Sequence, residues 1–186
     1  MLKSIIRPIV TLWEKLFSWA ENIKPVEDSP YGLLRMSVHP YKGLPATLDD
    51  GTKVDPGDYV LELHISNLTL AQGMVAGVEV ASDIQLLRLF REEIAHLAQL
   101  VHQGKLDPRI KAIWGVSMMG PALRRLGFTL EPMSESMGAR MIMIWMTFLK
   151  WVFSPRDAKT PSRKKRKRQG YQYWMSLEQL LNEYVR

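Results

Sequence analysis

Residues 50–67 place two turn signals directly before an alternating strand, and this order constrains the fold more than any other stretch of the chain. Asp50-Gly51 is typical of a two-residue hairpin loop, and Pro56-Gly57 suits a type II turn, in which glycine supplies the positive φ. From Tyr59 to Ser66 apolar and polar residues alternate. The alternation predicts a strand with one face packed on a core and the other face carrying polar side chains.

Patterns typical of strands and of helices alternate along the rest of the chain. Residues 33–38 have strand character, which His39-Pro40 breaks. The later elements that we expect are a helix over 83–104 closed by Gly104, a buried strand over 110–116, a helix over 119–126 that stops at Gly127, and a strand over 128–130. This order is typical of an α/β domain. We therefore predict an α/β (α+β) fold over residues 31–186, with a mixed central sheet flanked by helices.

Two further segments belong to this domain. Residues 140–153 are so apolar that periodicity cannot separate a buried strand from a helix, and their length favours a helix. Ser176 is followed three residues later by Gln179, which is a capping-box pattern and predicts a terminal helix.

The first residues form a separate amphipathic segment, 1–28. Apolar residues recur at helical spacing over 1–24, and Pro25 and the Asp28-Ser29-Pro30 cluster end the pattern. The favoured interpretation is a helix packed on its own core. The alternative is a helix lying on a membrane surface, which three aromatic and three basic residues favour, namely Trp13, Phe17, Trp19, Lys3, Arg7 and Lys15.

Targeting patterns favour a cytoplasmic protein, with peripheral contact at a membrane as the open alternative. Charged residues interrupt the N-terminal stretch, so it does not read as a signal peptide. The apolar run 141–149 stops at Lys150, well short of the roughly twenty residues that a spanning helix needs.

The net charge of +6 is concentrated in one run, 163–168, inside a predicted loop over 155–170. Six of the 25 Lys and Arg residues form this run, and the remaining 19 balance the 19 Asp and Glu residues. We predict a solvated loop that can bind a polyanion, and an anionic membrane is a further alternative. Nucleic acid is less favoured, although Tyr171, Tyr173 and Trp174 follow and could stack on bases or start a core strand. The predicted anion-binding residues are Arg163, Lys164, Lys165, Arg166, Lys167 and Arg168.

Glu62 and His64 are the candidate catalytic residues, together with Asn67 at the exit of the strand. Glu62 and His64 share one strand face, with Cα atoms roughly 7 Å apart. A carboxylate beside an imidazole can act as a general base. The alternative is that His64 hydrogen-bonds locally to order the following turn. The chain has no cysteine, which excludes a thiolate nucleophile or thiolate metal site.

Other motifs do not reach a complete site. Glu93-Ile94-Ala95-His96 occurs once, whereas a di-iron centre needs two copies, and we expect Glu92 and His96 to form a surface pair. Residues 115–120 resemble the Gly-x-Ser-x-Gly elbow of serine hydrolases, with Ser117 at the serine position. The second glycine falls one place late, and no histidine follows Ser117 in the sequence, so a serine hydrolase is not predicted. We predict neither a metal nor a cofactor.

Several motifs together resemble the YkoP-like family of bacterial proteins, which also occurs as a domain attached to polysaccharide deacetylases. The matching segments are 41–43, 48–52, 56–67, 112–117, 125–128, 148–155 and 174–181. The resemblance implies an accessory role in envelope or spore-surface polysaccharide biogenesis, without an established biochemical activity. Ser154 replaces the histidine of the family's His-Pro, and Ser66 replaces its second asparagine.

A weaker resemblance concerns the second half of the GNAT acyltransferase fold. The strand, helix, strand and helix expected over 59–126 follow its order, and the resemblance implies a GNAT-like sheet. Such enzymes hold acyl-CoA pyrophosphate with a glycine-rich loop at a helix start. The nearest match is 72–77, where Val75 replaces the middle glycine and breaks the motif. Acyl-CoA-dependent transfer is therefore kept as an alternative function.

Overall fold

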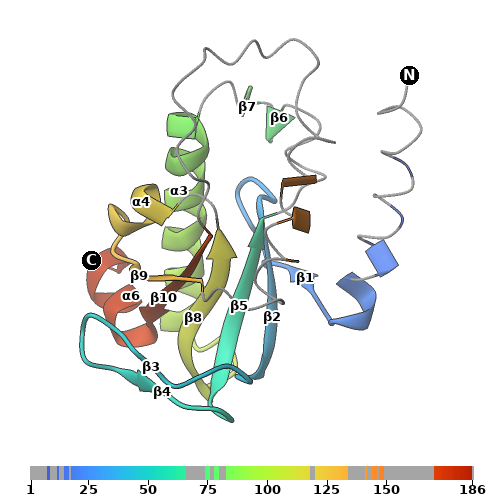
Figure 1. The fold of residues 1–186 in the computed structure, drawn as a ribbon. Helices are drawn as coiled ribbons and strands as arrows, with labels where there is room; N and C mark the ends of the chain where they lie inside the picture. The colour runs from blue at the N-terminus through green and yellow to red at the C-terminus, as the bar shows by residue number, and fades with distance from the viewer. Residues whose placement is uncertain are drawn as a thin grey trace.

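A computed structural model describes residues 18–65, 83–117, 120–133 and 170–185, together with isolated positions in the remaining segments. A six-stranded sheet forms its centre (Figure 1), and the strands lie in the order β1-β2-β5-β8-β10-β9. Their bounds are β1 Lys24–Pro25, β2 Leu34–Pro40, β5 Tyr59–Ile65, β8 Ile110–Ser117, β10 Tyr171–Ser176 and β9 Thr129–Pro132. β5 and β8 pair in parallel, and the other neighbours in this sheet pair antiparallel.

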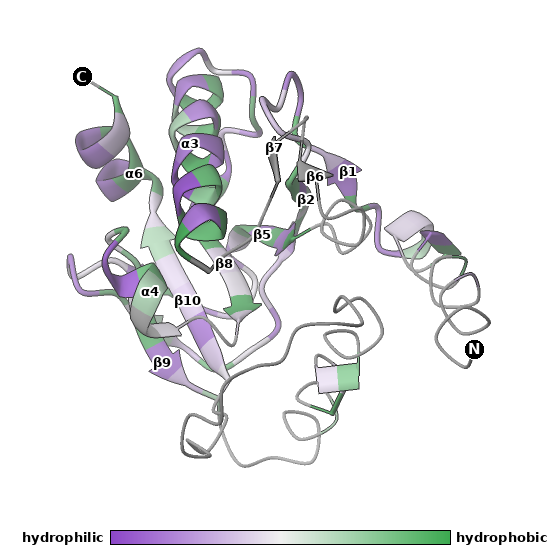
Figure 2. Cartoon of the chain, turned by 90° about the horizontal axis from the view of Figure 1, so that it is seen from above, coloured by the Kyte–Doolittle hydropathy of each residue, from purple (hydrophilic) through white to green (hydrophobic). Residues whose placement is uncertain are grey.

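Three helices accompany the sheet, namely α3 Asp83–His102, α4 Gly120–Arg124 and α6 Leu177–Tyr184. Figure 2 shows α3 and α6 on the same side of the sheet, with hydrophobic and hydrophilic bands along α3. Two small hairpins pair β3 Ala46–Thr47 with β4 Lys53–Val54 and β6 Met74–Val75 with β7 Val78–Glu79. The predicted mixed sheet flanked by helices is thus confirmed.

Two apolar cores lie on opposite faces of the sheet. The larger core joins the sheet to the helices and includes Leu61, Leu63, Phe90, Ile94, Leu97, Ile113, Leu123, Tyr173 and Leu180. The smaller core lies beside the β3–β4 hairpin and includes Tyr41, Ala46, Leu48, Val54, Val60, Ala112 and Trp174. The hairpin therefore packs at the end of the sheet where β5 begins, on the face opposite α3.

The second turn and the strand predicted over 56–65 are confirmed. A hairpin also forms around Asp50-Gly51, but its loop is longer than the predicted two residues, because the Leu48 amide donates to the Thr52 carbonyl over 2.8 Å. Gly51 and Gly57 have φ values of 86° and 99°, which glycine adopts without a Cβ penalty. The amide of Asp58 donates to the carbonyl of Asp55 over 3.0 Å and closes the second turn. In β5, Leu61 and Leu63 are buried in the larger core, so the polar residues between them lie on the other face.

β2 is longer than the sequence predicts. The expected strand ended at Val38, because His39-Pro40 reads as a break, but β2 continues through Pro40, which pairs with Tyr59. Proline is tolerated here because it is the last residue of the strand. The longer strand brings His39 onto the sheet.

The helix termini follow their expected signals in part. α3 is confirmed, and Gly104 beyond it has a φ of 67°. α4 is shorter than the predicted 119–126. The Ser176 hydroxyl accepts from the Gln179 amide over 2.9 Å, whereas the Gln179 side chain donates to the Gly127 carbonyl over 2.7 Å. Only the serine half of the predicted capping box is therefore formed.

Described positions within the first segment are helical at 8, 12, 15, 16 and 18–20. Leu12, Leu16 and Trp19 are exposed by 60%, 57% and 83%, so the favoured prediction of packing on the core is wrong at these three positions. Spacings of four and three residues place them on one helix face. Among the described helices, none combines the length and apolar character needed to cross a bilayer.

Candidate acid–base site

Glu62 lies between two histidines on the sheet face opposite α3. Its Oε2 is 2.8 Å from Nε2 of His39, and its Oε1 is 3.5 Å from Nε2 of His64. The strand register explains the grouping: His39 pairs with Val60, and Arg35 pairs with His64, so His39 and Glu62 are diagonal neighbours on one face. All three side chains of the cluster are about three-quarters buried, with exposures of 24–30%.

His39 faces hydrogen-bond acceptors on both sides. Its Nδ1 is 3.0 Å from the carbonyl oxygen of Pro40, and its Nε2 faces Glu62. The carbonyl oxygen accepts hydrogen bonds, so the ring of His39 lies between two oxygen atoms and its orientation is fixed by both contacts. Within the described residues, no group of three His, Asp or Glu side chains is arranged to hold a metal ion.

His64 has the opposite electrostatic environment. Burial lowers its pKa below the ordinary value of 6.5, and the charges of His39 and Arg35 lower the pKa further, while Glu62 opposes them. The Nε2 atom of His64 and the Nε atom of Arg35 are buried and have no hydrogen-bond partner in the described part of the chain. A neutral imidazole facing a carboxylate can accept a proton.

Trp114 forms an aromatic wall beside this cluster. It pairs with Glu62 in the β5–β8 register, and its indole N–H donates to the side-chain oxygen of Gln172 over 3.1 Å. Its ring meets those of His39 and Tyr41 edge to face, with centroids 6.2 Å and 5.8 Å apart. The side chain is partly exposed, so the polar cluster and an apolar surface lie next to each other.

β5 and β8 separate just beyond the cluster. Their pairing extends from Tyr59 and Ile110 to Glu62 and Trp114, although each strand continues for three further residues. The Tyr173 hydroxyl on β10 donates to the Leu63 carbonyl of β5 over 3.0 Å. This side-chain hydrogen bond lies beyond the last residue of β5 that pairs with β8.

The predicted pair Glu62 and His64 is thus brought together, and their proposed chemistry stays a prediction. Asn67 and the basic run 163–168 lie outside the described residues. His39 was missed, although alternation over 35–39 places it on the same face as Arg35. It was hidden because the following proline was interpreted as a break.

Two other expectations meet clear outcomes. Tyr173 and Trp174 are exposed by 2% and 0%, so they belong to the core and do not present rings to bases. The expected pair between Glu92 and His96 is wrong, because His96 Nε2 lies 2.7 Å from the carbonyl of Glu27 and Glu92 Oε1 accepts from Arg88 over 3.1 Å.

We expect the stability of the protein to fall below pH 6.5 partly because of His64. Its folded-state pKa is lowered, so the unfolded chain binds more protons as the pH falls below the ordinary value. The stabilising contribution is therefore retained above pH 6.5 and lost as the pH falls through the window beneath it. Urea unfolding at about pH 7.5 and 5.5 measures how much the free energy of unfolding falls between the two pH values, and this fall should be smaller in His64→Gln than in the wild type. His102→Gln is the exposed control, and an equal fall in wild type and His64→Gln would contradict the assignment.

Comparison with known proteins places the chain in a family. The model of the YkoP domain matches residues 3–184. The Bacillus subtilis (strain 168) protein described as "Uncharacterized protein YkoP" is 22% identical over 129 residues, which cover 68% of this chain and 70% of that protein. No solved structure matches the chain significantly. The matched range includes the first helix and the whole sheet, and the chain belongs to the YkoP domain family.

Proposed function

We propose that this protein is an accessory factor in bacterial envelope or spore-surface polysaccharide biogenesis, and that it contacts a glycan through the His39–Glu62–His64 cluster. The observation that carries the proposal is the position of Trp114 beside this cluster. A sugar ring has apolar C–H faces and a polar rim of hydroxyl groups. An indole with an adjacent carboxylate and imidazoles offers a surface for both parts.

The protonation states give the cluster a chemical role. A neutral His64 can accept a proton from a sugar hydroxyl, and Glu62 can stabilise the imidazolium that results. The buried Nε atoms of Arg35 and His64 without described partners leave hydrogen-bonding capacity at the same place. The resemblance to domains attached to polysaccharide deacetylases also supports a glycan as the partner.

Titration with chitin oligosaccharides and their partly N-deacetylated forms tests the proposal by amide chemical-shift changes. Trp114→Ala should weaken binding by about tenfold, because a stacking surface is lost. Trp19→Ala removes an exposed indole elsewhere and should leave binding unchanged. Glu62→Gln should weaken binding without unfolding the protein. Equal affinity in wild type and Trp114→Ala, or no shifts with any oligosaccharide, would overturn the assignment.

We further propose that the first helix rests on an anionic membrane surface. The exposure of Leu12, Leu16 and Trp19 supports it, because an amphipathic helix buries such a face in the headgroup region. Leu12→Glu with Leu16→Glu should abolish co-sedimentation with vesicles containing phosphatidylglycerol. Leu44→Glu, which changes a leucine exposed by 82% elsewhere, should not. Binding that survives the double change would count against this contact.

The separation of β5 and β8 favours acyl transfer as a second candidate function. Two diverging parallel strands can receive an extended ligand between them, in line with the GNAT-like order of elements. In the segment expected to match the cofactor loop, however, Met74–Val75 pairs with Val78–Glu79 as a hairpin. A rise in melting temperature with millimolar acetyl-CoA would support transfer, and the absence of a rise would exclude this candidate.

A further inference from the structure

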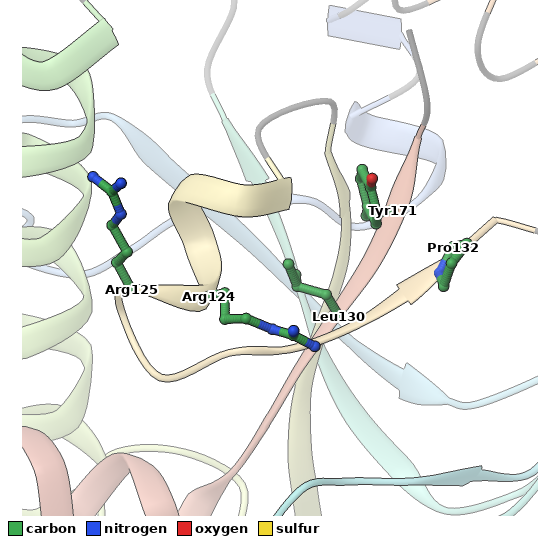
Figure 3. A pocket seen from close by; sticks show the side chains of 5 residues that line it. All are labelled: Arg124, Arg125, Leu130, Pro132 and Tyr171. Atoms are coloured by element: carbon green, nitrogen blue, oxygen red, sulfur yellow. The ribbon is translucent and has the colours of Figure 1, made fainter. Parts of the chain in front are cut away.

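We infer that a second site, on the helix side of the sheet, binds a phosphate or diphosphate group attached to an apolar or aromatic body. This arginine pocket has a volume of about 590 Å³ and is lined by Arg124, Arg125, Leu130, Pro132 and Tyr171 (Figure 3). Tyr171 lies two residues from Tyr173 on β10, so both point to the α3 side. The pocket is therefore on the opposite face from the His39–Glu62–His64 cluster, and the inference does not depend on the proposed function.

The charge of the pocket is available to a ligand. Three of the other described arginines have local partners: Arg35 donates to the Ile23 carbonyl, Arg88 pairs with Glu92, and Arg109 pairs with Asp107. Neither Arg124 nor Arg125 forms an ion pair with a described carboxylate, and both side chains are exposed. A guanidinium presents a fork of donors that matches phosphate oxygens.

The rest of the pocket wall is apolar and held in place. A Cβ added to Gly120 would lie 2.3 Å from the Tyr171 ring, so this ring packs directly on the backbone where α4 begins. Tyr171 also pairs with Pro132 across β10 and β9. Figure 3 shows Arg124 crossing Leu130 toward β9, with Tyr171 and Pro132 beyond it and Arg125 on the α3 side. A ligand can thus place its phosphate at Arg124 and its apolar body along Leu130 and Tyr171.

The chain path adds an independent observation for an anionic ligand. The amide of Met133 donates to the Gly170 carbonyl over 3.0 Å, so the connection between β9 and β10 starts and ends at the edge of the pocket. The six consecutive cations of 163–168 belong to this connection, and the last of them precedes Gly170 by two positions. The site itself consists of the five described residues.

Calorimetric titration of the full chain tests the inference with three probes, namely inorganic diphosphate, a nucleoside diphosphate and farnesyl diphosphate. The double variant Arg124→Ala/Arg125→Ala should weaken binding of the preferred organic diphosphate by about tenfold or more. Arg88→Ala removes another exposed guanidinium, on α3, and should change the affinity by less than about twofold. The melting temperature of each variant shows whether it is folded. If the alanine double variant is unstable, Arg124→Gln/Arg125→Gln replaces it and should show the same loss of affinity.

The outcomes separate the possible ligands. Tighter binding of the nucleoside diphosphate identifies a nucleotide, and tighter binding of farnesyl diphosphate identifies a lipid-linked phosphate, and either result supports the pocket. Inorganic diphosphate binding as tightly as both organic probes would overturn it, because the apolar wall would then contribute nothing. Retained affinity in the double variant would also overturn it, as would binding that is lost only when residues 163–168 are changed to serine.

Discussion

Replacing Glu93 by alanine should lower the free energy of unfolding by about 3–5 kcal/mol, as expected for leaving three donors of a buried hydrogen-bond network without an acceptor. The Glu93 side chain is fully buried on α3. Its carboxylate accepts from the Ser29 hydroxyl over 2.7 Å and from the amides of Tyr31 and Leu33 over 3.1 Å each. Alanine leaves these donors without their acceptor, and each unsatisfied buried group costs about 1–3 kcal/mol.

Two further substitutions make this prediction sharp. Glu93→Gln keeps one oxygen for the two amides and should lose clearly less stability than Glu93→Ala. Glu92→Ala, at the neighbouring and more exposed position, breaks the surface pair with Arg88 and the hydrogen bond from the Tyr31 hydroxyl, and it should lower the free energy of unfolding clearly less than Glu93→Ala. Urea unfolding followed by circular dichroism measures all three. If Glu93→Ala falls within the same range as Glu92→Ala, the carboxylate does not anchor the turn to α3.

Replacing Gly115 by alanine should lower the free energy of unfolding by about 1–3 kcal/mol through overpacking. The added Cβ would lie 2.3 Å from the Cζ and hydroxyl oxygen of Tyr173. That ring is exposed by only 2% and is fixed by edge-to-face contact with Phe128 at 5.3 Å between centroids. The tyrosine must shift and release the Leu63 carbonyl.

A double-mutant cycle tests this coupling. Tyr173→Phe alone leaves the buried Leu63 carbonyl without its described donor and should cost about 1–3 kcal/mol. Because both changes disturb one hydrogen bond, Gly115→Ala/Tyr173→Phe should cost less than the two single changes added together. Tyr184→Phe, whose hydroxyl donates to the less buried Leu126 carbonyl, should cost less than Tyr173→Phe. Full additivity in the cycle would show that the two positions act independently.

Sequence patterns predict the parts of this fold that depend on neighbouring residues. The alternation over 59–65 and the glycines at 51 and 57 describe backbone conformation within a few positions, and they were sufficient to place β5 and its turns. The periodicity of α3 similarly reflects one helix packing on one core.

Features that depend on distant partners could not be predicted in this way. Glu93 forms part of an apparent half metal motif in the sequence, yet its partners lie more than fifty residues away, at Ser29 and Leu33. His39 joins the candidate site only through the pairing of β2 with β5. The apolar pattern of the first helix also does not reveal whether its face meets protein or another surface.

The position of β10 constrains how the protein can be made. This strand inserts between β8 and β9, and Trp174 completes the smaller core with residues such as Tyr41 and Val54 from the first third of the chain. A ribosome delivers residues 171–176 after the other strands, so the sheet stays split until they emerge. Domains whose contacts span long sequence separations fold slowly. During synthesis the edges of β8 and β9 that β10 later covers are therefore open to incorrect pairing.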